Sequence, residues 1–276
     1  MRKINLQDGN LEATVLPDFG GVVSRLNISG VDVLRMNYEL LGMSNVLAGG
    51  IPILFPSVSK CPEDSAVFDG RAYTMPMHGF AKDVPFEVKG VGKKWCELTL
   101  SASPVWMDNF YPYDFRLILR YELENDSLKT TMCVENKSDK RMPMVLGYHP
   151  FFLTPDRNQT AFDFDLWENW DYTHCDENGP AHGFRDKPVR LEEAYDTVFL
   201  GDNARATLVN RQLGYRVEMD ADETFKVVTI CTALENASCV EPWQACSNAL
   251  NTNDMLQYVE RGASKSFWYR LSLSNV

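Results

Sequence analysis

Apolar and polar residues alternate with a period of two in many short runs along this chain, and this pattern constrains the fold more than any other feature. In residues 11–15 and 115–121, apolar residues recur at every second position, and those between are mostly charged or polar. Alternation of this kind gives an extended strand one apolar face. Similar runs occupy residues 86–91, 97–102, 162–166, 215–219, 225–232 and 267–273. We therefore predict a chain dominated by β-strands.

The order of these runs indicates antiparallel sheets. Residues 128–134 also alternate, and the polar segment 125–127 separates them from the run at 115–121, which predicts a hairpin. No long helical stripe competes with the strands, and short helices are expected only at 191–195 and near 251–256. Strands in succession without helical crossovers predict stacked antiparallel sheets.

Length and charge limit the domain organisation and the partners. The 276 residues are 45% hydrophobic, enough for a continuous core, and no linker-like segment divides them, so one domain over residues 1–276 is expected. The 38 acidic side chains outnumber the 27 basic ones, which argues against nucleic acid and anionic membranes. The N-terminus has no apolar signal core and no uncharged run is long enough to span a membrane, so a cytoplasmic location is expected.

The seven cysteines are scattered, and none forms a Cys-x-x-Cys pair. An odd number without pairing suits buried thiols in a reducing compartment better than a disulfide framework, and structural zinc is not expected. Cys239 and Cys246 flank the segment interpreted below as catalytic, and both are interpreted as packing residues. No metal site is predicted.

Two of the four histidines lie in unusual settings. His78 stands between Pro76 and Gly79, which indicates an irregular connection. His149 precedes Pro150 in an aromatic stretch, and a residue before proline is held extended, so the backbone aims the imidazole. For each of them, a hydrogen-bonded structural histidine is the alternative interpretation.

A third motif, Val240-Glu241-Pro242-Trp243, again places an ionisable side chain before a proline and beside a large aromatic ring. A carboxylate and nearby amides can bind sugar hydroxyls, and an indole offers an apolar surface for the C–H face of the ring. The three motifs together indicate a carbohydrate site that includes Glu241, Trp243 and the two histidines.

Taken in order along the chain, four motifs resemble the aldose 1-epimerase family. They are Gly50-Ile51-Pro52-Ile53-Leu54-Phe55-Pro56, His78-Gly79-Phe80-Ala81, Gly147-Tyr148-His149-Pro150-Phe151-Phe152 and Glu241-Pro242-Trp243. The likeness begins near residue 15 and continues to the run at 267–273, so it covers nearly the whole chain. It implies an all-β, antiparallel β-supersandwich of the galactose mutarotase-like type with few short helices. The activity that it implies is interconversion of the α and β anomers of an aldohexose, with no cofactor.

The resemblance also implies a role for each site residue. Glu241 would take the proton of the anomeric hydroxyl, and His149 would protonate the ring oxygen. His78 would hydrogen-bond to the sugar and orient it. Asp196 resembles the family's aspartate that binds ring hydroxyls, although a surface turn explains it nearly as well.

Two departures from the family pattern leave other functions open. Many mutarotases carry a sugar-binding arginine near the position of Gly49 and Gly50. The glucose-6-phosphate 1-epimerase branch often has arginine after His-Gly-Phe-Ala, where this chain has Lys82, which could hold a phosphate as a point charge only. A hexose-6-phosphate 1-epimerase and a non-catalytic carbohydrate-binding protein are therefore alternatives. The expected partner is a small-molecule sugar, bound by a monomer or homodimer.

Overall fold

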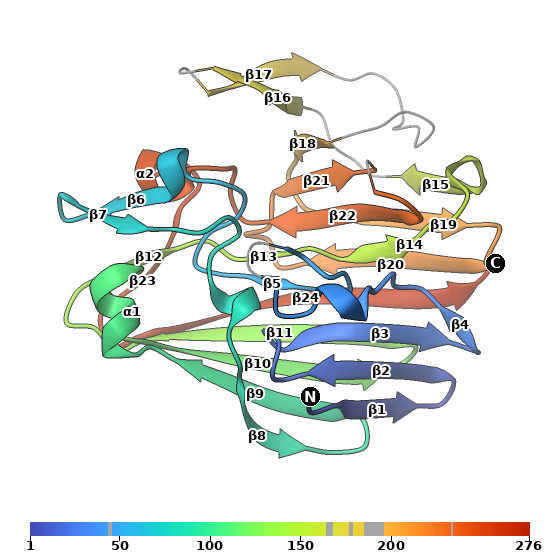
Figure 1. The fold of residues 1–276 in the computed structure, drawn as a ribbon. Coiled ribbons are helices and arrows are strands. Elements are labelled where there is room, and N and C mark those ends of the chain that lie inside the picture. The colour runs from blue at the N-terminus through green and yellow to red at the C-terminus, as the bar shows by residue number, and fades with distance from the viewer. Residues whose placement is uncertain (44–45, 164–167, 177–178, 185–195, 233) are drawn as a thin grey trace.

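The computed structural model describes residues 1–43, 46–163, 168–176, 179–184, 196–232 and 234–276. Its strands build two large antiparallel sheets that pack against each other (Figure 1). This arrangement confirms the predicted all-β sandwich. We name the two sheets after a central strand of each, the β22 sheet and the β24 sheet.

The β22 sheet has the order β17-β16-β18-β21-β22-β13-β5, and β14 pairs with β22 as well. Its strands are β5 (Ile53–Leu54), β13 (Gly147–Tyr148), β14 (Phe151–Leu153), β16 (Glu168–Asp176), β17 (Gly179–Phe184), β18 (Asp196–Leu200), β21 (Val227–Cys231) and β22 (Ala237–Trp243). Every residue of β22 is buried, because this strand lies in the interior of the sheet with both of its faces covered.

The β24 sheet has the order β15-β19-β20-β24-β11-β10-β9-β8. Its strands are β8 (Glu87–Val91), β9 (Trp95–Ser101), β10 (Phe115–Glu124), β11 (Ser127–Asn136), β15 (Thr160–Asp163), β19 (Ala206–Asn210), β20 (Tyr215–Ala221) and β24 (Ser264–Asn275). Most of the alternating runs of the sequence fall on these strands, whereas the run at 225–232 falls on β21 of the other sheet and the run at 11–15 on a smaller sheet. Residues 164–166 of the predicted 162–166 strand lie outside the described residues.

Smaller elements flank the two sheets. A four-stranded sheet consists of β1 (Ile4–Asp8), β2 (Leu11–Leu16), β3 (Val22–Ile28) and β4 (Val31–Asp32). Two strand pairs are β6 (Ser65–Phe68) with β7 (Arg71–Thr74), and β12 (Met142–Met144) with β23 (Gln257–Val259). Single 3₁₀ turns occupy Tyr38–Leu40, Pro62–Asp64, Ala81–Asp83 and Arg157–Gln159.

The β10–β11 hairpin forms where the sequence predicts it. Ten residue pairs run from Phe115 opposite Asn136 to Glu124 opposite Ser127. The two turn residues, Asn125 and Asp126, both have positive φ, 49° and 56°. Asn and Asp tolerate this left-handed backbone, which matches the twist of the strands that they connect.

The main core lies between the two sheets. Tyr148 of β13 stacks on Tyr269 of β24 with ring centroids 4.6 Å apart, and both side chains are almost completely buried. Since side chains alternate along a strand, Tyr148 in this core directs its neighbour His149 to the opposite face of the β22 sheet. The packing of Tyr148 between the two sheets therefore positions the His149 imidazole on the outer face of the β22 sheet.

Helices are few and short, but their positions differ in part from the prediction. The helix α2 covers Ala249–Thr252, earlier than the predicted 251–256, because Asn253 turns left-handed with φ 62° and ends it. The helix α1 (Pro104–Asn109) was not predicted. The helix predicted at 191–195 falls outside the described residues. Within the described part of the chain, no helix has the length and apolar character needed to cross a bilayer.

Candidate active site

The strand register places His149 directly opposite Glu241. On one side of a break in the ladder Gly147 pairs with Trp243, and on the other side Phe151 pairs with Cys239. Continuing either register by two residues brings His149 opposite Glu241. The break itself has a simple cause, because Pro150 follows His149 and lacks the N–H that a ladder needs. Residues opposite each other on neighbouring strands have their Cβ atoms about 5 Å apart, so their side chains meet.

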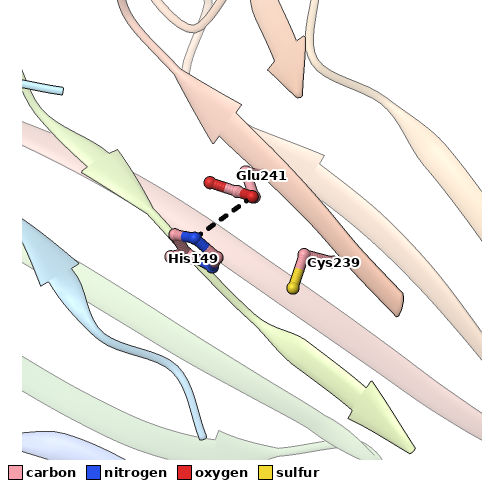
Figure 2. A group of neighbouring side chains, drawn as sticks. All are labelled: His149, Cys239 and Glu241. Carbon is pink, nitrogen blue, oxygen red and sulfur yellow. Dashed lines mark ion pairs between the residues drawn. The ribbon is translucent and has the colours of Figure 1, made fainter. Parts of the chain in front are cut away.

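The two side chains are in contact and buried. His149 Nε2 lies 3.2 Å from Glu241 Oε1, as Figure 2 shows. The Glu241 side chain is 2% exposed and the imidazole 10% exposed, so the pair reaches solvent mainly by the imidazole. Phe151 stacks on the imidazole with ring centroids 4.5 Å apart. The predicted acid–base residues therefore form one desolvated pair.

His78 completes the histidine cluster. Its ring centroid lies 5.3 Å from that of His149 and 5.9 Å from that of Trp243, edge-on in both cases. The Ser59 N–H donates to His78 Nδ1 over 3.0 Å, which assigns the proton of a neutral ring to Nε2. The His78 backbone is left-handed, with φ 64°, as the predicted irregular connection implies.

Burial keeps both imidazoles uncharged. Desolvation lowers the pKa of His78 to about 3, with a smaller contribution from the positive charge of Lys82. Desolvation lowers the pKa of His149 well below its usual value, and the neighbouring His78 lowers it further by a smaller amount. Both rings are therefore expected to be neutral near pH 7.

Several buried polar atoms of this region have no hydrogen-bond partner among the described residues. They include His149 Nδ1, Trp243 Nε1 and Thr229 Oγ1. Thr229 stands directly opposite Glu241 on β21, and its hydroxyl was not singled out from the sequence. Buried polar groups are rarely left unpaired in folded proteins, so groups like these offer hydrogen bonds to a ligand.

The Lys82 ammonium is buried and paired with a carboxylate. Its side chain is 3% exposed and forms an ion pair with Asp83. Together with Gly49, Pro52 and mainly apolar side chains it lines a cavity of about 120 Å³. At Gly50, an added Cβ would lie 2.4 Å from the Val23 carbonyl oxygen, so an arginine cannot occupy that position.

For Asp196 the structure describes the backbone alone. It begins β18 and pairs with Cys231, which in turn pairs with Cys239. This row lies two residues along the strands from the row that contains Glu241 and Thr229, with the row of Ile230 and Val240 between them. The Asp196 side chain is outside the described part of the structure, so its role in sugar binding stays a prediction.

Cys239 was interpreted from the sequence as a packing residue, and it is indeed fully buried. However, its sulfur lies within 4.8 Å of a ring nitrogen of His149 and a carboxylate oxygen of Glu241. The signal was present in the sequence, since residues two apart on a strand share a face. Cys239 therefore belongs to the site.

The fold and the site define a galactose mutarotase-like supersandwich with a carboxyl–imidazole pair in its β22 sheet. The Slr1438 protein from Synechocystis sp. PCC 6803 has this fold, with a TM-score of 0.92 and 26% identity over 100% of this chain and 96% of that one. A galactose mutarotase-like protein from Clostridium acetobutylicum has it too, with a TM-score of 0.82 and 20% identity over 99% of this chain and 95% of that one. So does a galactose 1-epimerase from Lactobacillus acidophilus, with a TM-score of 0.75 and 13% identity over 98% of this chain and 92% of that one. The aldose 1-epimerase family profile matches residues 2–272, and the chain belongs to this family.

Proposed function

We propose that this chain is an aldose 1-epimerase of a neutral aldohexose, with Glu241 and His149 as its acid–base pair. The observation that carries the proposal is the 3.2 Å contact between His149 Nε2 and Glu241 Oε1 in a desolvated setting. Opening a pyranose ring requires removal of one proton and donation of another at nearby oxygens, and such a pair can do both. The direct test is the rate of anomer interconversion in a fresh solution of a neutral aldohexose.

The charge state of the pair follows from its burial. His149 is uncharged because burial lowers its pKa, and burial in general disfavours the charged form of a carboxyl group as well. We infer that the pair holds one proton between Nε2 and Oε1. Moving this proton from Glu241 to His149 gives a carboxylate and an imidazolium without any exchange with solvent.

In that form the pair can open the ring. Glu241 takes the proton of the anomeric hydroxyl, His149 gives its proton to the ring oxygen, and the bond between C1 and the ring oxygen breaks. The products are the open-chain aldehyde and an uncharged pair. After rotation about the C1–C2 bond, the reverse transfers close the ring on its other face. Each positioned proton transfer typically contributes a factor of ~100 to 10,000 in rate.

Sugar binding involves the groups around the pair. His78 Nε2–H, the indole N–H of Trp243 and the Thr229 hydroxyl can bond to ring hydroxyls, and the Phe151 and Trp243 rings offer apolar surface. Because the Glu241 side chain is only 2% exposed, the side chains that cover it have to move aside when the sugar enters.

Replacing His78 by asparagine should raise KM about 5- to 10-fold and change kcat less, since one hydrogen bond to a bound hydroxyl is worth about 1–1.5 kcal/mol. Steady-state kinetics with the neutral sugar measure both constants. The outcome against this role is a large fall in kcat with an unchanged KM, which would place His78 in the proton transfer itself.

The burial of Lys82 argues for a neutral substrate over a phosphorylated one. Its ammonium is already paired with Asp83 in a mainly apolar surrounding, and a phosphate site normally presents unpaired cations. Raising the salt concentration from 20 to 500 mM should therefore change KM for the neutral sugar by less than about twofold, because salt screens only charge–charge attraction.

Lys82→Met is the matched variant for this test. It should leave the neutral sugar as the preferred substrate at every salt concentration. A lower KM for the hexose 6-phosphate than for the hexose, lost at high salt and in Lys82→Met, would instead identify a hexose-6-phosphate 1-epimerase.

A further inference from the structure

A third potential metal ligand lies beside the acid–base pair. One ring nitrogen of His149, the Cys239 sulfur and one carboxylate oxygen of Glu241 all lie within 4.8 Å of one another, and all three residues are buried. Cys239 and Glu241 both project from β22 toward His149 (Figure 2). We propose that this cluster reversibly binds a zinc-class divalent cation, which competes with the sugar for the pair.

The donor set and its spacing suit zinc. Zinc takes thiolate, imidazole and carboxylate donors at about 2.0–2.3 Å, usually in a tetrahedron, which spaces the donor atoms by roughly 3.3–3.7 Å. The His149–Glu241 contact of 3.2 Å is already near this spacing. The sulfur has to approach by no more than about 1.5 Å to reach this spacing. Mg²⁺ and Ca²⁺ prefer sites made of oxygens alone, so a thiol in the cluster disfavours them.

The charges also balance. A thiolate at Cys239 and a carboxylate at Glu241 together neutralise a divalent cation, and His149 contributes a neutral imidazole. Binding releases the thiol proton and the proton that Glu241 and His149 share. A buried site with zero net charge avoids the cost of an uncompensated ion in a desolvated setting.

The surroundings favour a metal ion that binds reversibly over one that is bound permanently. In permanent zinc sites, a histidine ligand usually donates its second N–H to a carboxylate or carbonyl. Among the described residues, His149 Nδ1 has no such acceptor. The bound cation would occupy the two groups that move protons, so it should inhibit the enzyme. The inhibition rests on the proposed function, whereas the binding does not.

Cobalt titration tests the binding itself. Co²⁺ added to chelator-treated wild-type protein should produce a thiolate-to-cobalt charge-transfer band that saturates at one equivalent and disappears when Zn²⁺ is added. In Cys239→Ser the band should be lost. Affinity for Zn²⁺ should fall by at least about 100-fold, since losing even an outer-shell partner costs 10- to 100-fold. Cys246→Ser, at a buried cysteine outside the cluster, should behave as wild type.

A second measurement does not depend on how well Cys239→Ser folds. Zinc-edge X-ray absorption of the wild-type complex should show one sulfur in the first shell. A wild-type protein without the charge-transfer band, a band retained in Cys239→Ser, or a first shell of nitrogen and oxygen alone would each overturn the proposal. Zinc should also stop anomer interconversion, and a chelator should restore it. If the cobalt signature appears in a protein without epimerase activity, the metal site holds and the proposed function fails.

Discussion

Replacing Glu241 by glutamine should slow anomer interconversion by about 100- to 10,000-fold, because the amide keeps the size of the side chain but cannot accept or return a proton at the required step. His149→Asn should cause a loss of the same order. The double variant should be little slower than the slower single variant, because the two groups act as one unit. Polarimetry of a freshly dissolved sugar measures all three rates.

Matched controls separate chemistry from folding in this experiment. Glu124→Gln changes an exposed glutamate at the end of the β10–β11 hairpin and should retain the wild-type rate. The thermal unfolding of Glu241→Gln shows whether the fold survives. A folded Glu241→Gln protein with the wild-type rate would exclude Glu241 as the base, and independent, additive losses in the double variant would contradict a shared proton.

Gly79→Ala should destabilise the fold by about 3–5 kcal/mol, through overpacking together with a left-handed backbone. Gly79 has φ 69°, and an added Cβ would lie only 2.1 Å from the Phe55 carbonyl oxygen. The Phe80 amide donates to the same carbonyl, so the backbone has little room to shift. Urea unfolding gives the change in free energy.

Gly9→Ala is the control for backbone strain alone. Gly9 has φ 56°, and nothing lies within 4 Å of its added Cβ. Its alanine variant should lose only about 1–2 kcal/mol. If Gly79→Ala and Gly9→Ala lowered the free energy of unfolding equally, the close approach of Gly79 to Phe55 would not stabilise the loop that carries His78.

Local alternation predicted the strands of the β24 sheet apart from β19, but only β21 of the β22 sheet. The alternation in β10 and β11 and the polar residues Asn125 and Asp126 determine the hairpin within one short segment of chain. Helix α2 was misplaced because its end depends on the left-handed conformation of Asn253, which residue type alone does not impose. The single domain, the cytoplasmic location and the oligomeric state stay predictions.

The site could be predicted only in part, since its geometry comes from strand pairing over long distances in the chain. The residues before Pro150 and Pro242 identify His149 and Glu241 as candidates, yet their pairing depends on the register between β13, β14 and β22. The burial of Lys82 was also unexpected, because lysine is rarely buried unless it is paired. Asp83, next to it in the sequence, is the partner that makes this burial possible.

In the proposed mechanism, a proton shared by an imidazole and a carboxyl group opens and closes a sugar ring. Optical rotation should be followed after α-glucose or α-galactose is dissolved at neutral pH, with and without the wild-type protein. We expect the protein to bring at least one of these sugars to its anomeric equilibrium much faster than buffer does, in proportion to the amount added. Folded protein that leaves the rate of both sugars at the buffer value would contradict the account.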